Sequence, residues 1–371
     1  MAVHDSFTGR HRASDGPGYL TPGHRDSYDG PWHRTPADLA GPAGEGGTVV
    51  EGSMTQGAGE GPDVWRQGGN AGGPAVPPVP DGYTPTLPDL PVIEGTGPLY
   101  VAGDVHGYLD ELRAALREAG LTDAEDRWAA GNARLWFLGD FTDRGPDGVG
   151  VIDLVMRLSA EAAAAGGYCK ALLGNHELLL LGASRFGDTP VDSGAGTASF
   201  QAAWMLNGGQ RTDMERLRDH HIQWMARLDS MAVADGYLLL HSDTTAYLDY
   251  GSTVDDVNEA IKLALQRSDA DETWELFRKF TKRFAFRDEG GPKAARELLA
   301  TYGGRQIVHG HSPIPYLTGE GVVEADADGE DGTGAPRVDG PHVYADSLAI
   351  AMDGGVTMAG KLLVARLPLT A

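Results

Sequence analysis

The sequence predicts an α/β fold whose N-terminal half forms a largely parallel sheet. Between residues 98 and 182, three short apolar runs, each ending in glycine and a polar residue, alternate with three segments of helical periodicity. This order of strand, loop and helix is typical of a parallel sheet, because parallel neighbours are joined by crossover helices. With 371 residues, 41% of them hydrophobic, the chain can form one large core or two modest ones.

The first 92 residues do not share this pattern. Segments such as GPAGEGG and GGNAGGPAVPPVPDG are rich in glycine and proline and poor in periodic apolar residues. Such a stretch cannot bury enough surface to offset its ordering entropy. We therefore predict a mostly disordered arm over residues 1–92, a candidate for binding a partner or regulating the rest, and a folded domain over residues 93–371.

Each element of the first half follows from its own pattern. Apolar runs predict strands, and leucines three or four residues apart, as at Leu109, Leu112 and Leu116, predict helices. In chain order the predicted elements are a strand at 98–104, a helix at 108–120, a strand at 134–140, a helix at 151–165, a strand at 168–175 and a helix that starts at 175.

The second half is less regular. Residues 183–235 are predicted to be a helical insertion, because apolar residues such as Met214, Leu217 and Leu228 fall on one face. The following patterns predict a strand at 236–243, two or three helices within 255–300, a strand at 305–311 and short antiparallel strands within 342–367. The acidic stretch 320–336 is interpreted as a solvated loop, since its spacing fits a calcium loop poorly.

Charge and composition exclude several classes of function. The 30 basic and 53 acidic residues leave a formal net charge of −23, which repels phosphate backbones and argues against a nucleic-acid partner. The N-terminus has no apolar signal region and no stretch has the length of a membrane span, so we expect a cytoplasmic protein. Cys169 is the single cysteine, which excludes an intrachain disulfide and a thiolate cluster. It falls in a predicted buried strand, a poor setting for a nucleophile.

Polar residues that can bind metal follow five of the apolar runs. In an open α/β sheet the loops at the carboxyl ends of the strands converge, and ligands bind there. Each residue alone would be an ordinary turn former, but five coincident strand ends predict a shared site. The residues are Asp104 and His106, Asp140, Asn175, His241, and either His309 or His311.

The donor types restrict the metal. Carboxylate, amide and imidazole groups without thiolate suit Mn²⁺, iron or Zn²⁺, whereas several imidazoles argue against Ca²⁺ or Mg²⁺ alone. We favour two Mn²⁺ ions, with iron or zinc as alternatives. A carboxylate such as Asp140 could be shared by two ions roughly 3.5–4 Å apart.

The motifs GDVHG, GDFTDRG and GNHE occur in this order at intervals of about 35 residues. In this respect the chain resembles the calcineurin-like metallophosphoesterases, and most closely their phosphoprotein phosphatase branch, whose signature is GDxHG, GDxxDRG and GNHE. The resemblance covers about residues 98–366. It implies a four-layer sandwich in which two mixed β-sheets are flanked by helices, with a dinuclear metal site at the strand ends.

The resemblance also implies a ligand for each position of the metal site. Asp104 and His106 would bind the first ion, and Asp140 would bridge both. Asn175, His241 and one histidine of VHGHSP would bind the second ion. Since the family ligand follows the glycine, His311 is chosen over His309.

The catalytic groups are likewise implied by the resemblance. His176 would donate a proton to the leaving oxygen, and Asp143 would hold its other ring nitrogen. Arg144 would clamp the phosphate oxygens, together with a second arginine for which we choose Arg287, with Arg283 as the alternative. Glu177 is interpreted as structural, since it falls in the first turn of its helix.

The function implied is hydrolysis of phosphomonoesters, by a hydroxide that bridges the metals and attacks phosphorus directly. Phosphoserine and phosphothreonine in proteins are the expected substrates, and a small phosphoester is another. Relatives with the same core hydrolyse dinucleoside polyphosphates, so a diadenosine tetraphosphate hydrolase is the alternative. A phosphatase fold that only binds phosphorylated partners is a third reading, but such proteins usually lack a ligand or the proton donor, and this sequence has a candidate for each.

Overall fold

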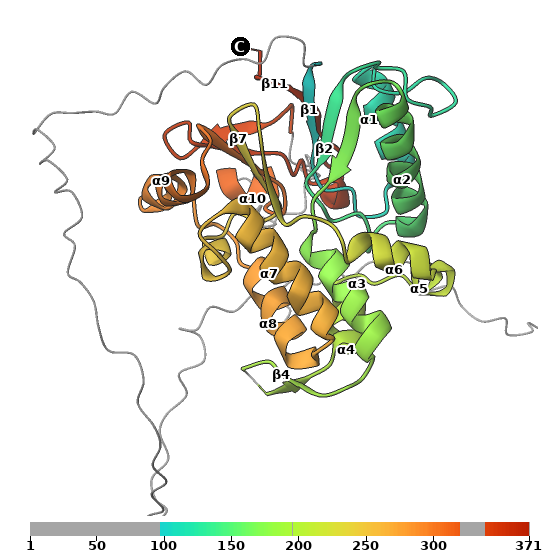
Figure 1. Cartoon of the computed structure of the whole chain (residues 1–371), viewed down its shortest axis with the longest axis vertical. Coiled ribbons are helices and arrows are strands. Elements are labelled where there is room, and N and C mark those ends of the chain that lie inside the picture. The colour runs from blue at the N-terminus through green and yellow to red at the C-terminus, as the bar shows by residue number, and fades with distance from the viewer. Residues whose placement is uncertain (1–96, 195, 320–337, 371) are drawn as a thin grey trace, which may run out of the picture. The chain divides into compact units, whose positions relative to one another are not determined.

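A computed structural model describes residues 97–194, 196–319 and 338–370. The predicted arm at residues 1–92 and the acidic loop at 320–336 lie outside the described residues. Within the described part the expected α/β fold is confirmed, with two mixed sheets between layers of helices (Figure 1).

The first sheet has the order β11-β1-β2-β3 and contains the three predicted N-terminal strands. Its central strands are parallel, with Leu99 opposite Arg134 and Arg134 opposite Tyr168, and β11 pairs antiparallel with β1. The strands are β1 Leu99–Ala102, β2 Arg134–Phe137, β3 Tyr168–Ala171 and β11 Val364–Leu367.

The second sheet has the order β6-β7-β8-β10-β9. Its strands β7, β8 and β10 are parallel, and β6 and β9 lie antiparallel at the two edges. The strands are β6 Met231–Ala234, β7 Tyr237–Leu240, β8 Gln306–His309, β9 His342–Tyr344 and β10 Ala349–Ala351, while a separate small ribbon joins β4 Val191–Asp192 to β5 Thr197–Ala198.

The two sheets pack face to face over one apolar core. Val101 and Trp136 of the first sheet share a buried cluster with Leu239, Val308 and Ile350 of the second. Burial of this apolar surface is the main force that holds the sheets together. Figure 1 shows α1 and α2 outside the first sheet and α9 outside the second, so the order of layers is helix, sheet, sheet, helix.

Ten α-helices occur among the described residues. The first, α1, is fixed by Leu109, Leu112 and Leu116, which are all buried, and α2 is capped by the carboxylate of Asp147. The helices are α1 Leu109–Glu118, α2 Gly148–Ala164, α3 Asn175–Phe186, α4 Phe200–Leu206, α5 Arg211–Arg216, α6 Asp219–Met225, α7 Val254–Arg267, α8 Ala270–Phe280, α9 Gly291–Tyr302 and α10 Ile314–Thr318, with 3-10 turns at Ala246–Asp249 and Val356–Met358.

The segment 183–235 contains more than helices. After α3 it holds the ribbon of β4 and β5 and three short helices, and its last part forms β6 of the second sheet. Strand β6 turns into β7 through Asp235 and Gly236, both with positive φ, as in a two-residue hairpin. The predicted helical segment therefore ends before Met231, and residues 231–234 form a strand instead. Helical periodicity did not reveal this strand, because it is defined by its pairing with β7 across the Asp-Gly turn.

Candidate dinuclear metal site

The six predicted metal ligands lie at the carboxyl ends of strands from both sheets. Four follow strands of the first sheet, and two follow β7 and β8 of the second. All six side chains are buried, with at most 3% of each residue exposed. The predicted ligands are Asp104, His106, Asp140, Asn175, His241 and His311.

Asp140 stands at the centre of this group. Its Oδ2 lies 3.6 Å from Nε2 of His106, and its Oδ1 lies 3.3 Å from Nε2 of His241. Asp140, His241 and His311 each offer a ligand atom within 4.8 Å of the others. One carboxylate therefore contacts imidazoles from both sheets, as a bridging ligand must.

Two of the imidazoles are held with their free nitrogen towards Asp140. Nδ1 of His106 donates to the carbonyl of Thr142 at 3.2 Å, and Nδ1 of His241 donates to the carbonyl of Leu138 at 3.0 Å. Because Nδ1 of each neutral ring carries the proton, Nε2 carries the lone pair. Backbone carbonyls thus fix the tautomers that metal ligation requires.

His311 uses the opposite nitrogen in the same way. Its Nε2 donates to the carbonyl of Thr281 at 3.1 Å, while its buried Nδ1 has no hydrogen-bond partner among the described residues. A buried nitrogen without a partner is costly, and a metal ion would satisfy it. The backbone N–H of His311 also donates to both oxygens of Asp104, at 3.0 and 2.9 Å, which ties the two ligands together.

Two lone pairs of this cluster face each other directly. Oδ1 of Asn175 lies 2.9 Å from Nε2 of His241, so an amide oxygen faces an unprotonated ring nitrogen. Such an arrangement is repulsive unless a cation lies between the two atoms. The donor set, its burial and this geometry all fit divalent metal ions.

Electrostatics support the same conclusion. Burial lowers the pKa of His106, His241 and His311, so the rings are neutral and able to bind metal. Burial also raises the pKa of Asp104, and the nearby carboxylates of Asp353 and Asp140 raise it further. Crowded carboxylates of this kind are stabilised by a cation.

The backbone is strained at five of the predicted site residues. They adopt left-handed φ values between 48° and 69°, a region that residues other than glycine seldom occupy. Such strain is concentrated at functional sites, where the surrounding structure imposes it. The residues are His106, Asp140, Asp143, Arg144 and His311.

His309 and His311 lie in different surroundings. Nδ1 of His309 contacts the carbonyl of Gly310 at 2.8 Å, and its Nε2 contacts the hydroxyl of Tyr344 at 2.7 Å. Both nitrogens of His309 are therefore engaged away from Asp140. Gly310 itself is required, since a Cβ there would lie 2.1 Å from Oδ1 of Asp104.

His176 lies beside the metal ligands and is paired with Asp143. Its Nδ1 is 2.7 Å from Oδ2 of Asp143, and its ring packs edge-on against that of His106 with centroids 4.6 Å apart. The backbone N–H of His176 donates to Oδ1 of Asp140 at 3.0 Å. A histidine oriented by a buried carboxylate is suited to proton transfer.

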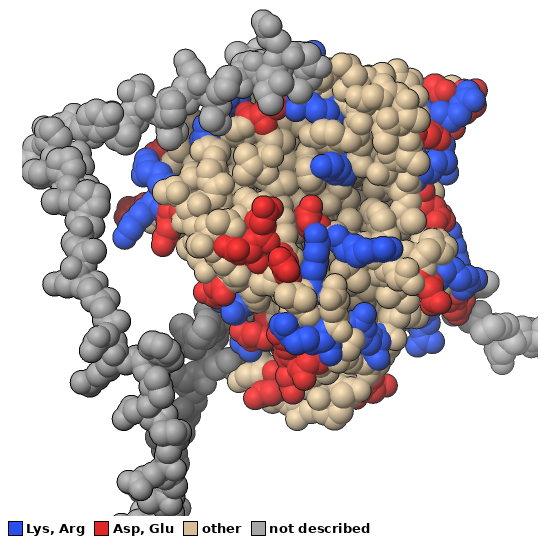
Figure 2. Space-filling view, viewed as in Figure 1, with Lys and Arg blue, Asp and Glu red and all other residues tan. Residues whose placement is uncertain are grey.

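Arg144 reaches over the site. One of its terminal nitrogens lies 2.9 Å from Nε2 of His106, and the other lies 3.1 Å from Nε2 of His176. Its guanidinium fork is thus placed where phosphate oxygens could be bound bidentately. In Figure 2, seen from the same side as Figure 1, basic and acidic side chains lie side by side near the centre of the face, over the start of α3.

The second arginine needs a correction. Arg287 is exposed, pairs with Asp288 at 3.2 Å and stacks on Phe284, and no described contact joins it to the metal ligands. Arg283 instead donates to the carbonyl of His311, and its Nε–H is buried without a partner among the described residues. The structure therefore brings the alternative residue, Arg283, to the site, because the backbone turns between positions 283 and 287.

Glu177 has the structural role expected for it. Its carboxylate accepts backbone N–H groups from Gly174 at 3.0 Å and from Asp140 and Phe141 at 2.8 Å each. It therefore joins the start of α3 to the loop that carries Asp140. Burial, followed by the charge of Asp140, raises the pKa of Glu177 to about 8.

Two further residues at the site were missed by sequence reasoning. Trp204 of α4 donates its indole N–H to Oδ1 of Asp143 at 2.7 Å. Asp353, two residues after β10, is buried, and its negative charge favours the protonated forms of Asp104 and Arg283. Trp204 lies within a helix, whereas Asp353 follows the apolar run of β10, which was the one signal available for it.

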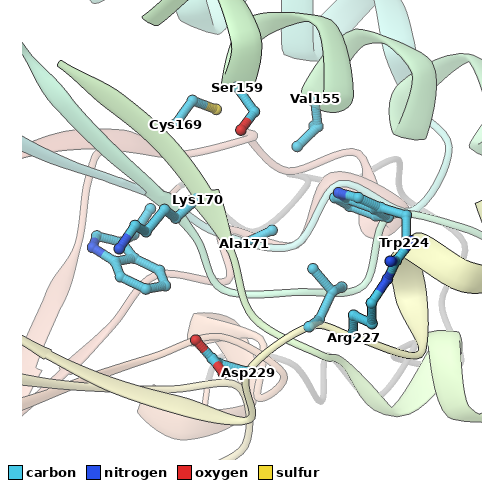
Figure 3. A pocket seen from close by; sticks show the side chains of 10 residues that line it. Val155, Ser159, Cys169, Lys170, Ala171, Trp224, Arg227 and Asp229 are labelled. Carbon is cyan, nitrogen blue, oxygen red and sulfur yellow. The ribbon is translucent and has the colours of Figure 1, made fainter. Parts of the chain in front are cut away.

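A hollow of about 210 Å³ beside β3 is a separate feature (Figure 3). Its lining includes Cys169, Lys170, Trp224 and Arg227 and none of the predicted site residues. Burial raises the pKa of the Cys169 thiol, so the sulfur is neutral and a poor nucleophile.

A histidine cluster on the surface is also distinct from the site. Asp153, His220 and His221 have ligand atoms within 4.8 Å of one another. However, Nε2 of His221 contacts Asp153 at 2.9 Å, and its Nδ1 accepts the backbone N–H of Arg218 at 3.1 Å. Because both ring nitrogens are used, His221 ties α6 to α2 and is not free to bind a metal.

Comparison with known proteins gives a consistent result. A family model described as calcineurin-like phosphoesterase matches residues 97–315, which is more than half of the chain. The chain is 38% identical over 81 residues to Shewanella-like protein phosphatase 2 of Arabidopsis thaliana. It is 39% identical over 83 residues to the symmetrical bis(5'-nucleosyl)-tetraphosphatase of Photorhabdus laumondii subsp. laumondii.

These alignments are short. They cover 22% of this chain in both cases, and 21% and 25% of the two relatives. Among solved structures, the cold-active protein-tyrosine phosphatase of a psychrophile Shewanella sp. matches with a TM-score of 0.52 at 19% identity, covering 73% of this chain and 75% of that one. At this level of identity the likeness concerns the fold alone. No helix among the described residues is long and apolar enough to cross a membrane.

Proposed function

Because this chain belongs to the calcineurin-like phosphoesterase family, as its motifs predict, we propose that it is a metal-dependent phosphatase of the phosphoprotein phosphatase branch. One observation carries the proposal. Three imidazoles, each fixed by a backbone carbonyl, turn an unprotonated nitrogen towards the group around Asp140, with the His176–Asp143 pair beside them. This combination can bind two metal ions around Asp140, and it can transfer a proton from His176 beside them.

The metal ligands divide into two sets around Asp140. Asp104 and His106 would hold one ion, Asn175, His241 and His311 the other, and Asp140 would contact both. When bound, two such ions supply Lewis acidity and an activated water as the nucleophile. We propose Mn²⁺ as the resident ion, with iron and zinc as the alternatives that elemental analysis distinguishes.

The two arginines bind and orient the phosphate. Arg144 offers two terminal nitrogens at the mouth of the site, and Arg283 has a buried Nε–H without a partner among the described residues. Fixed cations of this kind stabilise the negative charge on the phosphoryl oxygens in the transition state. They also hold phosphorus in line with the nucleophile.

His176 acts on the leaving group. As the ester P–O bond breaks, its electron pair stays on the departing oxygen, and the Nε2–H of His176 gives that oxygen a proton. Asp143, at 2.7 Å from Nδ1, stabilises the protonated form of the ring before transfer. No covalent enzyme intermediate is required, in keeping with the burial of Cys169.

Phosphoserine and phosphothreonine in proteins are the proposed substrates. The similarity to a protein phosphatase supports this choice, and the similarity to a bis(5'-nucleosyl)-tetraphosphatase supports the alternative, a dinucleoside polyphosphate hydrolase. A protein that only binds phosphorylated partners is disfavoured, because every proposed ligand and the proton donor are present and lie together.

A substrate panel tests the proposal. Protein loaded with Mn²⁺ is assayed on phosphoserine, phosphothreonine and phosphotyrosine peptides and on diadenosine tetraphosphate, with His176→Asn as the control. We expect phosphate release from the serine and threonine peptides that His176→Asn largely abolishes. Preferential cleavage of diadenosine tetraphosphate would establish the alternative, and tight phosphopeptide binding without turnover would establish a binding protein.

A further inference from the structure

The carboxylate of Asp143 is held at both of its oxygens. Oδ2 accepts from Nδ1 of His176 at 2.7 Å, and Oδ1 accepts from the indole N–H of Trp204 at 2.7 Å. All three residues are buried, with no more than 1% of each exposed. Water therefore cannot replace the indole as the second donor, and the orientation of the carboxylate depends on Trp204.

Trp204 comes from α4, 61 positions after Asp143. Helix α4 packs on α3, the helix that begins at the metal site, and the contact is close because a Cβ at Gly182 would lie 2.1 Å from the ring of Phe200. A Cβ at Gly209 would in turn lie 2.3 Å from the ring of Trp204. The indole is thus confined by its surroundings and cannot turn away from Asp143.

The same segment holds Arg144 by a different contact. The backbone N–H of Arg144 donates to the carbonyl of Gly208 at 2.7 Å. Gly208 has a φ of +92°, and a Cβ there would lie 2.8 Å from Cγ of Arg144. Trp204 and Gly208 are four residues apart, yet one contacts the partner of His176 and the other contacts the phosphate-binding arginine.

We propose that Trp204 is a positioning residue for proton transfer to the leaving group. Its N–H fixes the carboxylate of Asp143, which holds the Nδ1–H of His176 and so directs Nε2 towards the departing oxygen. Indole is a donor only, so Trp204 does not itself carry the proton. This inference rests on the proposed function, in which His176 protonates the oxygen as the P–O bond breaks.

The effect of Trp204 should depend on the leaving group. An alkoxide such as the serine oxygen is a poor leaving group and needs the proton, whereas p-nitrophenolate leaves well without it. When Oδ1 of Asp143 has lost its donor, the rate of leaving-group protonation is expected to fall by about ten- to hundredfold. Trp204→Phe should therefore lower kcat on a phosphoserine peptide by this amount and lower kcat on p-nitrophenyl phosphate by less than about threefold.

Three further variants separate positioning from packing. Trp204→His keeps an N–H three bonds from Cβ, as in indole, and should restore most of the activity on phosphoserine that Trp204→Phe loses. Trp274→Phe is the matched control, since Trp274 is equally buried and its ring lies 5.0 Å from that of Phe200. Trp274→Phe should lower the stability of the protein, and any change in kcat should be the same for both substrates. Gly208→Ala should raise KM for both substrates, because it displaces Arg144.

The position of the Asp143 carboxylate can be measured in a crystal structure and does not depend on an activity assay. In a crystal structure of Trp204→Phe, the carboxylate should rotate or the distance from Oδ2 to Nδ1 of His176 should increase beyond 2.7 Å. Equal losses on both substrates, or an unmoved Asp143, would overturn the inference. An inactive wild-type protein would contradict the proposed function instead, and the Asp143 geometry would still decide the role of Trp204.

Discussion

The loops that follow β1, β2 and β3 differ from the later segments that complete the site. In the first region each proposed metal ligand lies within four residues of the strand it follows, in a short motif with glycine. In the later region Trp204 and Arg283 reach the site from α4 and from the turn after α8, over long distances in sequence. The metal centre is thus encoded locally, whereas the orientation of the proton donor and the phosphate depends on tertiary packing.

The largest expected effect comes from the local region. Asp140→Asn removes a carboxylate that contacts imidazoles from both sheets. We expect metal content to fall with activity, and kcat to drop roughly a thousandfold or more, since the loss of metal assistance costs several kcal/mol. Elemental analysis and a phosphatase assay on the same sample check this. Full metal content with normal turnover would show that Asp140 does not bridge two ions.

Loss of the proton donor should leave the metals bound. His176→Asn is expected to lower turnover of alkyl phosphates by about 10²- to 10⁴-fold, the usual contribution of a general acid, with metal content unchanged. Asp104→Asn is the comparison, because it should lower metal content and activity together. If His176→Asn also removed the metals, His176 would be a ligand and another group would supply the proton.

The two arginines test whether the later region takes part in phosphate binding. Arg283→Met should lower kcat/KM by about ten- to hundredfold, the value of a charged hydrogen bond to the transition state. Arg287→Met is the matched control from the same segment and should change kcat/KM by less than about twofold. The reverse order of effects would restore Arg287 as the residue that binds phosphate.

These residues illustrate what sequence can and cannot predict. The gathering of the proposed ligands was predictable because polar residues directly after buried strands must lie at one edge of each sheet. Arg283 and Arg287 were not separable, since both follow α8 and nothing local indicates which one the chain turns inward. Trp204 was not predictable either, because an indole in an amphipathic helix looks like core, and its bond to Asp143 depends on how α4 packs against α3.

The fold shows the same division. Apolar runs and leucine spacing predicted β1, β2 and β3 and helices α1 to α3, whose contacts are close in sequence. Strand β7 was predicted, but its hairpin partner β6 was hidden within the predicted helical insertion, although the Asp235-Gly236 turn was present in the sequence. Periodicity identifies a helix or strand from its own residues. The pairing of two strands can be predicted only when the partner strand is also known.

The smallest expected effect concerns stability and compares a local with a distant helix cap. Asp147 caps α2 from the preceding residue, whereas the buried carboxylate of Asp213 in α5 accepts N–H groups of Gly148 and Val149 at 3.1 Å each. Asp147→Ala should cost about 1 kcal/mol of unfolding free energy. Asp213→Ala should cost about 2–3 kcal/mol, because it leaves two buried donors unpaired. Chemical denaturation measures both, and equal losses would show that the distant cap contributes no more than the local one.

Anomalous diffraction from crystals of the Mn²⁺-loaded protein tests the dinuclear centre most directly. We predict two anomalous peaks, roughly 3.5–4 Å apart, with the carboxylate of Asp140 between them and His106 and His241 on opposite sides. A single peak, or manganese bound only at a distant group such as His220 and Asp153, would contradict the account.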